Sequence, residues 1–250
     1  MKEKQIFVCT ECGTEYYKWQ GKCDICGNWN TIVERIITTS SKNKVSSLRS
    51  PGKLLKLVSS GIKPPERINT GFSELDRVLG GGVVPGSTIL IGGPPGIGKS
   101  TLLMQVVSSM ASNGQRVIYL SGEESPEQIM LRAARIGAIS DNLFILTETD
   151  ITQLISEIEQ EEYSVVVIDS VQSVYLPELE TAAGSYSQIK EITRVISELA
   201  KSKNISVFLV GHITKEGAIA GPKFLEHMVD VVLYFEEETD GEYRLIRVFK

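Results

Sequence analysis

Residues 88–110 read TILIGGPPGIGKSTLLMQVVSSM, and this stretch decides the fold. An apolar run of strand length leads into GPPGIGKS at 93–100, which fits the pattern G-x-x-x-x-G-K-[ST], and an amphipathic stretch follows at 101–110. Glycines let the loop turn its backbone N–H groups inward, so that phosphate oxygens can approach without meeting a Cβ atom. The pattern predicts an ATP-binding phosphate loop made by Gly93, Pro94, Pro95, Gly96, Ile97, Gly98, Lys99, Ser100 and Thr101.

Two residues of this loop carry its chemistry. Lys99 would bring a positive charge to the β and γ phosphates, and the Ser100 hydroxyl would ligate Mg²⁺. The helix that begins here adds the positive end of its dipole. A glycine-rich turn without a ligand is the alternative, and the strand–loop–helix context argues against it.

Two further predicted strands end in a polar side chain. The run VVVID at 165–169 delivers Asp169 at the carboxyl end of a strand, where open α/β sheets bind ligands, and we expect it to hold Mg²⁺ through water. An aspartate that caps the next turn is the alternative. His212 ends another strand and would sense the γ-phosphate, although a lone histidine is often a structural polar group.

A hydrolase also needs a group that deprotonates the attacking water. Glu123 and Glu124 directly follow a predicted strand at 117–120, and we expect Glu123 to be the general base. Both could instead be first-turn acids of the helix that Ser125 and Pro126 open, where they would suit the helix dipole. One acid could do each job.

From residue 68 onward, apolar runs of strand length alternate with helical patterns. Several runs are continuous and β-branched, as expected for strands buried on both faces of a parallel sheet. The predicted strands are 88–91, 117–120, 143–146, 165–168 and 206–210. Helical spacing marks 151–158 and 189–199, and two antiparallel strands are expected at 231–235 and 243–249. The alternation predicts a doubly wound α/β fold with a mainly parallel sheet.

All four cysteines lie near the N-terminus, as two C-x-x-C pairs separated by ten residues. Two such pairs can hold Zn²⁺ in a closed tetrahedron, which is a structural site because no position stays open for water. A pair of redox dithiols is the weaker alternative. Trp19 and Trp29 are expected to cover the small core, or else to stack on bases. The predicted zinc ligands are Cys9, Cys12, Cys23 and Cys26.

Composition divides the chain into three regions. Residues 1–35 form the zinc-binding module, 36–67 a basic linker and 68–250 the ATPase domain. The linker reads as a solvated tether, or as a helper in binding a phosphate backbone. The formal net charge of -5 does not decide whether nucleic acid is a partner. No apolar run of membrane-spanning length and no signal peptide is found, so we expect a cytoplasmic protein with no membrane partner.

The motifs together resemble the RadA, or Sms, family of bacterial DNA-repair ATPases, whose core is RecA-like. The resemblance extends over essentially the whole chain, and its last motif is the most family-specific. It is carried by the cysteine pairs with KW at 18–19 and GNWN at 27–30, TGFSELDRVLGGG at 70–82, the phosphate loop, SGEES at 121–125 and GHITKEGAIAGP at 211–222.

This resemblance implies a ring-forming, DNA-dependent ATPase that promotes branch migration in homologous recombination. The partners would be single-stranded or branched DNA, further copies in a hexameric ring, and recombinase or helicase proteins. In such rings the segment after His212 faces the central channel, so Lys215 and Lys223 become candidate DNA contacts.

One departure from the family concerns the C-terminal side. The family continues after the ATPase core with a K-N-R-F-G motif and a Lon-protease-like domain, and Lys250 matches the first residue of that motif. Lys250 is therefore a further candidate DNA contact. We expect less than full motor activity from these residues alone.

Two other functions share the phosphate loop. A KaiC-like nucleotide-dependent switch or scaffold would act on protein partners without moving on DNA. The cysteine module, the basic linker and the lysines after His212 favour the DNA motor. A small-molecule kinase would need an arginine-bearing lid, and no segment reads as one.

Overall fold

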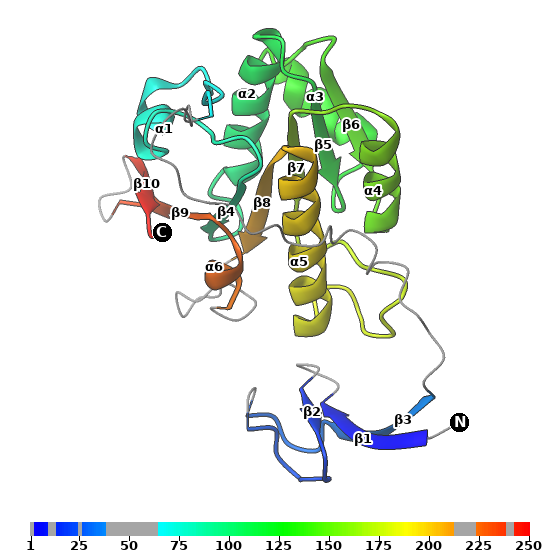
Figure 1. Cartoon of the computed structure of the whole chain (residues 1–250). Coiled ribbons are helices and arrows are strands. Elements are labelled where there is room, and N and C mark those ends of the chain that lie inside the picture. The colour runs from blue at the N-terminus through cyan, green and yellow to red at the C-terminus, as the bar shows by residue number, and fades with distance from the viewer. Residues whose placement is uncertain (1–2, 10–13, 25–26, 39–64, 213–223, 239–242) are drawn as a thin grey trace, which may run out of the picture.

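The phosphate-binding sequence lies at the centre of a large sheet. The computed structural model describes residues 3–9, 14–24, 27–38, 65–212, 224–238 and 243–250 (Figure 1). Within them, seven strands take the order β10-β9-β4-β8-β7-β5-β6, and all neighbours are parallel except the pair β9 and β10. The strands are β4 (Thr88–Gly93), β5 (Val117–Ser121), β6 (Leu143–Thr147), β7 (Val165–Asp169), β8 (Ser206–His212), β9 (Val231–Glu237) and β10 (Arg244–Val248).

Helices cover both faces of this sheet, which confirms the predicted α/β fold with a mainly parallel sheet (Figure 1). Alternate residues of β5 show the two layers, because Leu120 packs into the core under α4 and α5 whereas Tyr119 packs into the core under α2 and α3. The described helices are α1 (Ser73–Val78), α2 (Lys99–Ser112), α3 (Pro126–Arg135), α4 (Ile151–Gln160), α5 (Tyr186–Lys203) and α6 (Phe224–Met228).

The strand order decides which residues meet at the carboxyl edge of the sheet. β4 lies between β8 and β9, and in the register Gly93 stands beside His212. β5 and β7 are also neighbours, and Ser121 stands beside Asp169. The predicted site residues at four strand ends are therefore gathered along one edge.

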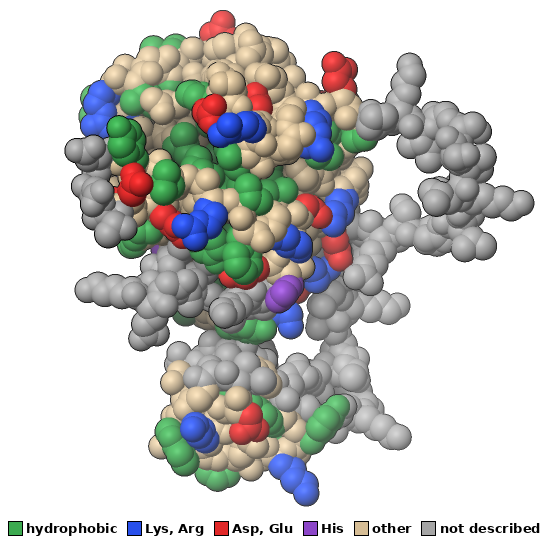
Figure 2. Space-filling view, turned by 90° about the vertical axis from the view of Figure 1, so that its left-hand side faces the viewer, with side chains coloured by type: hydrophobic (Ala, Val, Ile, Leu, Met, Phe, Trp, Pro, Cys, Tyr) green, Lys and Arg blue, Asp and Glu red, His purple; other side chains and the backbone are tan. Residues whose placement is uncertain are grey.

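The last two strands form a hairpin whose position the sequence does not reveal. They pair antiparallel, as predicted, with Ile246 opposite Phe235. β9 also runs parallel to β4, so the hairpin extends the sheet beside the strand that carries the phosphate loop. On the face of the molecule that carries β10, the described acidic, basic and hydrophobic side chains are interspersed (Figure 2).

The N-terminal module, residues 3–38, has a sheet of its own. Its three described strands take the order β2-β1-β3, and they are β1 (Glu3–Cys9), β2 (Glu15–Tyr16) and β3 (Ile32–Thr38). β3 thus continues three residues past the expected boundary at Arg35. Cys9, Cys23 and Ile32 are its buried cluster.

The two tryptophans do not cover this small core. Trp19 is 60% and Trp29 69% exposed, so the expectation that they form a core is wrong. A cluster this small cannot enclose an indole ring. Trp19 instead donates its ring N–H to the Ile32 carbonyl at 3.0 Å, and both rings lie beside Gly21, where a Cβ would be 3.9 Å and 3.8 Å from Trp19 and Trp29.

None of the helices in the described ranges is long and apolar enough to cross a membrane.

Candidate active site

The phosphate loop has the backbone that its glycines predict. Gly98 has φ 109° and is the N-cap residue of α2, and no side chain caps this helix end. A Cβ on Gly93 would lie 2.6 Å from the carbonyl oxygen of Phe235, so only glycine fits there. The first N–H groups of α2 are therefore available to an anion, as the triphosphate of ATP requires.

Lys99 is buried against this loop. Its ammonium donates hydrogen bonds to the carbonyl oxygens of Gly93 at 2.8 Å and Pro94 at 3.0 Å. Burial lowers the pKa of Lys99, and the negative charges of Asp169 and Glu123 act in the opposite direction. Both carboxylates are thus close enough to the lysine to influence its charge.

His212 connects the phosphate loop with the predicted general base. Its Nδ1 lies 3.4 Å from the Lys99 ammonium, and its Nε2 lies 3.3 Å from Oε1 of Glu123. These contacts join residues that follow or end β4, β8 and β5, which the strand order brings to one edge. A histidine in this position can respond to what the lysine binds and transmit the change to the glutamate.

Glu123 is held from a second direction by Ser170. The Ser170 hydroxyl, which is fully buried, donates to Oε1 of Glu123 at 2.5 Å. The turn that carries the glutamate needs a glycine, because a Cβ on Gly122 would lie 2.5 Å from the hydroxyl oxygen of Ser173. Ser170 follows Asp169 directly, yet its sequence context gives no sign of this contact.

Glu124 faces a different partner. It forms an ion pair with Arg132 of α3, whose side chain is 10% exposed. The same helix begins with a capping box, in which Ser125 and Gln128 each accept a hydrogen bond from the other's backbone N–H. The two neighbouring acids therefore have different surroundings. Glu123 faces the phosphate loop, and Glu124 is paired with α3.

Asp169 is oriented by a buried tyrosine. The Tyr119 hydroxyl donates to Oδ2 of Asp169 at 2.5 Å, and Arg132 lies 3.4 Å from that hydroxyl and 5.8 Å from the Tyr119 ring centre. Burial raises the pKa of Tyr119 well above its usual value, and the charge of Asp169 adds to the effect. The tyrosine stays protonated and fixes one oxygen of the carboxylate.

Sequence reasoning did not find Tyr119, Arg132 or Ser170. The one available signal was a tyrosine in the otherwise aliphatic run VIYL, since a buried hydroxyl needs a partner.

The N-terminal module shows half of its predicted metal site. Cys9 and Cys23 come from different C-x-x-C pairs, and both are fully buried in one cluster. Their backbone N–H groups donate to the carbonyl groups of Thr14 at 3.0 Å and Asn28 at 2.9 Å, so each cysteine bonds to the residue five positions after it. This repeated hydrogen bond fits a metal held by two C-x-x-C pairs. Cys12 and Cys26 lie outside the described residues.

Of the three predicted DNA contacts, one lies in the part of the chain that the structure describes. Lys215 and Lys223 lie outside the described residues. The Lys250 ammonium donates to the carbonyl oxygens of Glu226 at 3.2 Å and Val229 at 2.8 Å, at the end of α6. Its role in DNA binding stays a prediction.

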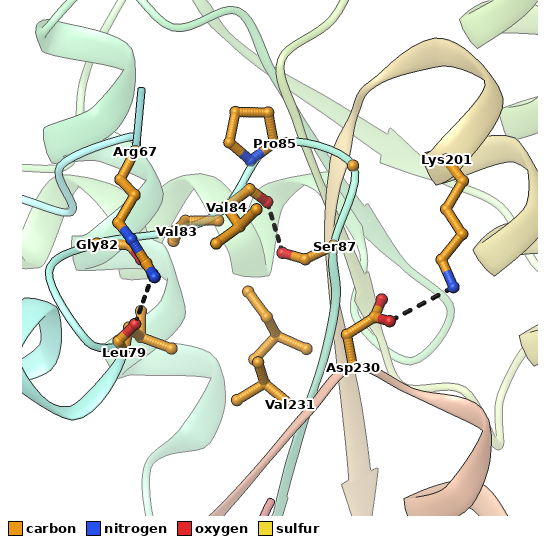
Figure 3. Close-up of a pocket in the computed structure, with 12 residues that line it drawn as sticks. Arg67, Leu79, Gly82, Val83, Val84, Pro85, Ser87, Lys201, Asp230 and Val231 are labelled. Atoms are coloured by element: carbon orange, nitrogen blue, oxygen red, sulfur yellow. Dashed lines mark hydrogen bonds and ion pairs between the residues drawn. The ribbon is translucent and has the colours of Figure 1, made fainter. Parts of the chain in front are cut away.

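A pocket of 430 Å³ lies away from these groups, among residues that precede β4 and begin β9 (Figure 3). Its polar groups are bound to the protein itself. Arg67 donates to the carbonyl oxygens of Leu79 and Gly82, and Asp230 pairs with Lys201 at 3.4 Å. The pocket opens at the amino ends of the strands, opposite the phosphate loop, and its side chains stabilise the fold.

Two protein families match the chain. Residues 58–218 match the AAA domain family, and residues 7–34 match the rubredoxin metal binding domain. The DNA repair protein RadA of Halalkalibacterium halodurans is 46% identical over 252 residues, which cover 100% of this chain and 55% of that protein. RadA of Aquifex aeolicus is 48% identical over 249 residues, again 100% of this chain and 55% of the relative. The chain thus spans about half the length of the curated relatives it matches.

Among solved structures, an ATPase domain from another protein aligns with a TM-score of 0.63 and 18% identity, over 74% of this chain and 84% of that one. At this identity the likeness concerns the fold alone. It agrees with the sheet and helices described above.

Proposed function

The chain belongs to the AAA domain family, and from this premise we propose that it is a DNA-dependent ATPase that acts in DNA repair and homologous recombination. Its similarity to bacterial RadA proteins over its whole length bears out the resemblance found in its motifs and supports the assignment to DNA repair. The finer part of the proposal is a hexameric ring that moves on DNA and promotes branch migration of recombination intermediates.

The observation that carries the ATPase proposal is the chain of contacts from Lys99 through His212 to Glu123. It joins a cation that would bind phosphate to a carboxylate that can accept a proton. Hydrolysis of ATP requires both of these groups. Ser170 holds Oε1 of Glu123, so the other oxygen of this half-exposed carboxylate is available to water.

Each residue then has a distinct role in hydrolysis. The N–H groups of the phosphate loop and Lys99 bind the β and γ phosphates. Glu123 orients a water molecule against the γ-phosphorus and takes its proton as the bond to ADP breaks. Ser100 and Asp169 would hold Mg²⁺, which would neutralise charge on the phosphate oxygens. His212 senses the γ-phosphate of a nucleotide in the phosphate loop and transmits its presence to the segment that follows His212.

The zinc part of the proposal rests on the two described cysteines and on the rubredoxin-type match at residues 7–34. We expect Cys9, Cys12, Cys23 and Cys26 to hold one structural Zn²⁺. The exposed rings of Trp19 and Trp29 are then available to stack on unpaired bases. Lys215 and Lys223 would supply DNA contacts after His212.

The test is steady-state ATP hydrolysis by the purified chain with and without single-stranded DNA, at two salt concentrations. DNA should raise the rate, and salt should suppress the rise, because cation contacts with phosphates are lost as salt increases. Rates that do not respond to DNA, both in this chain and in a chain extended past Lys250, would contradict the motor and favour a nucleotide-dependent switch on protein partners.

A matched pair of variants tests the general base. Glu123→Gln should lower kcat by about 10²–10⁴-fold and leave ADP binding intact, because the amide cannot accept the proton. Glu161→Gln is the control, since Glu161 makes a surface ion pair with Arg116 away from the phosphate loop. Equal rates for the two variants would show that Glu123 is not the base.

A further inference from the structure

Arg244, the first residue of β10, lies against the phosphate loop. A Cβ on Gly98 would be 3.0 Å from its Nη1 atom and 3.9 Å from the Phe235 ring. The guanidinium therefore approaches Gly98, the N-cap residue of α2. A guanidinium at this position is close enough to contact a nucleotide whose phosphates lie in the loop.

The side chain of Arg244 is exposed and forms no ion pair or hydrogen bond with the described residues. Glu237 stands opposite it in the strand register, yet no ion pair joins these two described residues. Arg247, on the same strand, pairs with Glu236 at 3.3 Å. Within the described part of the chain, Arg247, which lies away from the phosphate loop, is thus neutralised by an ion pair. Arg244, which lies against the loop, is left without one.

The order of the strands shows which end of a nucleotide Arg244 would meet. Glu123 follows β5 and Asp169 ends β7, both on one side of β4, whereas Arg244 begins β10, the second strand of the hairpin on the other side. The γ-phosphate must point toward the carboxylates, because the water that attacks it is activated there. The nucleoside end then points across β4 toward β9 and β10.

From this arrangement we propose that Arg244 binds the nucleoside end of ATP and ADP, with its guanidinium against the ribose and the base. The planar guanidinium can stack on the face of a base and donate hydrogen bonds from its edge. This inference rests on the proposed ATPase function, because it needs a nucleotide in the phosphate loop. It adds a binding residue from a strand that the phosphate-loop motif does not include.

The test compares Arg244→Ala with Arg247→Ala. Arg247 lies three residues along the same strand, on its opposite face, so the two variants lose the same charge from one hairpin. Binding is measured by titration with a fluorescent ADP analogue, with unlabelled ADP and inorganic pyrophosphate as competitors. Thermal unfolding confirms that both variants fold.

Arg244→Ala should weaken ADP binding about 10-fold, as expected for the loss of one stacking contact. Its affinity for pyrophosphate should match that of the unmodified chain, because pyrophosphate has no nucleoside. Arg247→Ala should bind both competitors normally. ADP affinity that is equal in the two arginine variants would overturn the proposal, and so would an equal loss for pyrophosphate and ADP.

Lys99→Ala separates this inference from the proposed function. If Lys99→Ala loses nucleotide binding and Arg244→Ala keeps it, Arg244 is not a nucleoside contact, while the phosphate-loop assignment stands. If Lys99→Ala binds ADP normally, the ATPase proposal fails, and the role of Arg244 fails with it.

Discussion

The N-terminal module and the nucleotide-binding domain differ in what stabilises the interior of each. In the module, the buried cluster is Cys9, Cys23 and Ile32, and both tryptophans of the chain are at the surface. In the domain, two layers of apolar side chains cover the sheet, and even Tyr119 and Phe208 are fully buried. Apolar burial stabilises the domain, whereas we propose that a metal stabilises so small a module.

This difference predicts how a substitution in each region will affect stability. A change at a cysteine should act on the module as a whole, because the proposed metal site would supply most of its folding free energy. A change in the domain should act according to the volume or the hydrogen bond that it removes. Three predictions test the contrast.

The largest effect is expected from removal of the metal. A zinc-selective chelator, or Cys23→Ser, should unfold the module, since a structural Zn²⁺ contributes about 10–16 kcal/mol in small zinc domains. Both tryptophans of the chain are in the module, so tryptophan fluorescence reports this region alone. ADP binding by the domain should not change. Loss of ADP binding together with the fluorescence change would show that the two regions do not fold independently.

A cavity in the domain should have an intermediate effect. Leu120→Ala removes a fully buried side chain from the core under α4 and α5, and should lower the free energy of unfolding by about 2–5 kcal/mol. Denaturant titration followed by circular dichroism measures this change. Leu131→Ala is the control, because Leu131 is 73% exposed. A matching change in tryptophan fluorescence would contradict the separation of the two regions.

The smallest effect is expected from one hydrogen bond at the site. Tyr119→Phe removes the hydroxyl that donates to Asp169, and should raise the Mg²⁺ concentration for half-maximal hydrolysis about 10-fold, because a metal-holding carboxylate loses its orienting partner. Tyr163→Phe is the matched control, since that hydroxyl donates to Glu157, away from the phosphate loop. An unchanged Mg²⁺ requirement in Tyr119→Phe would show that the hydrogen bond does not support the metal site.

Local signals in the sequence were sufficient for most of the fold. Periodicity placed the five parallel strands from β4 to β8 close to their observed ends, because strands buried on both faces are continuous apolar runs. The hairpin at the end of the chain was also predicted. The capping residues Ser125 and Pro126 correctly marked the start of α3.

The contacts between strands could not be predicted in the same way. That Glu123 reaches His212, and that β9 lies beside β4, depends on the order of strands in the sheet, which no single segment encodes. The Tyr119 hydroxyl and Arg132 are similar cases, since their partners are distant in sequence. The tryptophans were misjudged for another reason: hydrophobic character predicts burial only where the surrounding core is large enough.

β10 has a further consequence, for how the chain behaves at high concentration. Among the described strands β10 lies at the edge of the sheet, where backbone groups can pair with other chains, and the exposed hydrophobic residues on and beside it would favour such contacts: Tyr243, Leu245, Val248 and Phe249. The strand is five residues long and carries Arg244 and Arg247. Short length and an unpaired charge on an edge oppose pairing between copies. We therefore expect Arg244 to limit aggregation through this edge.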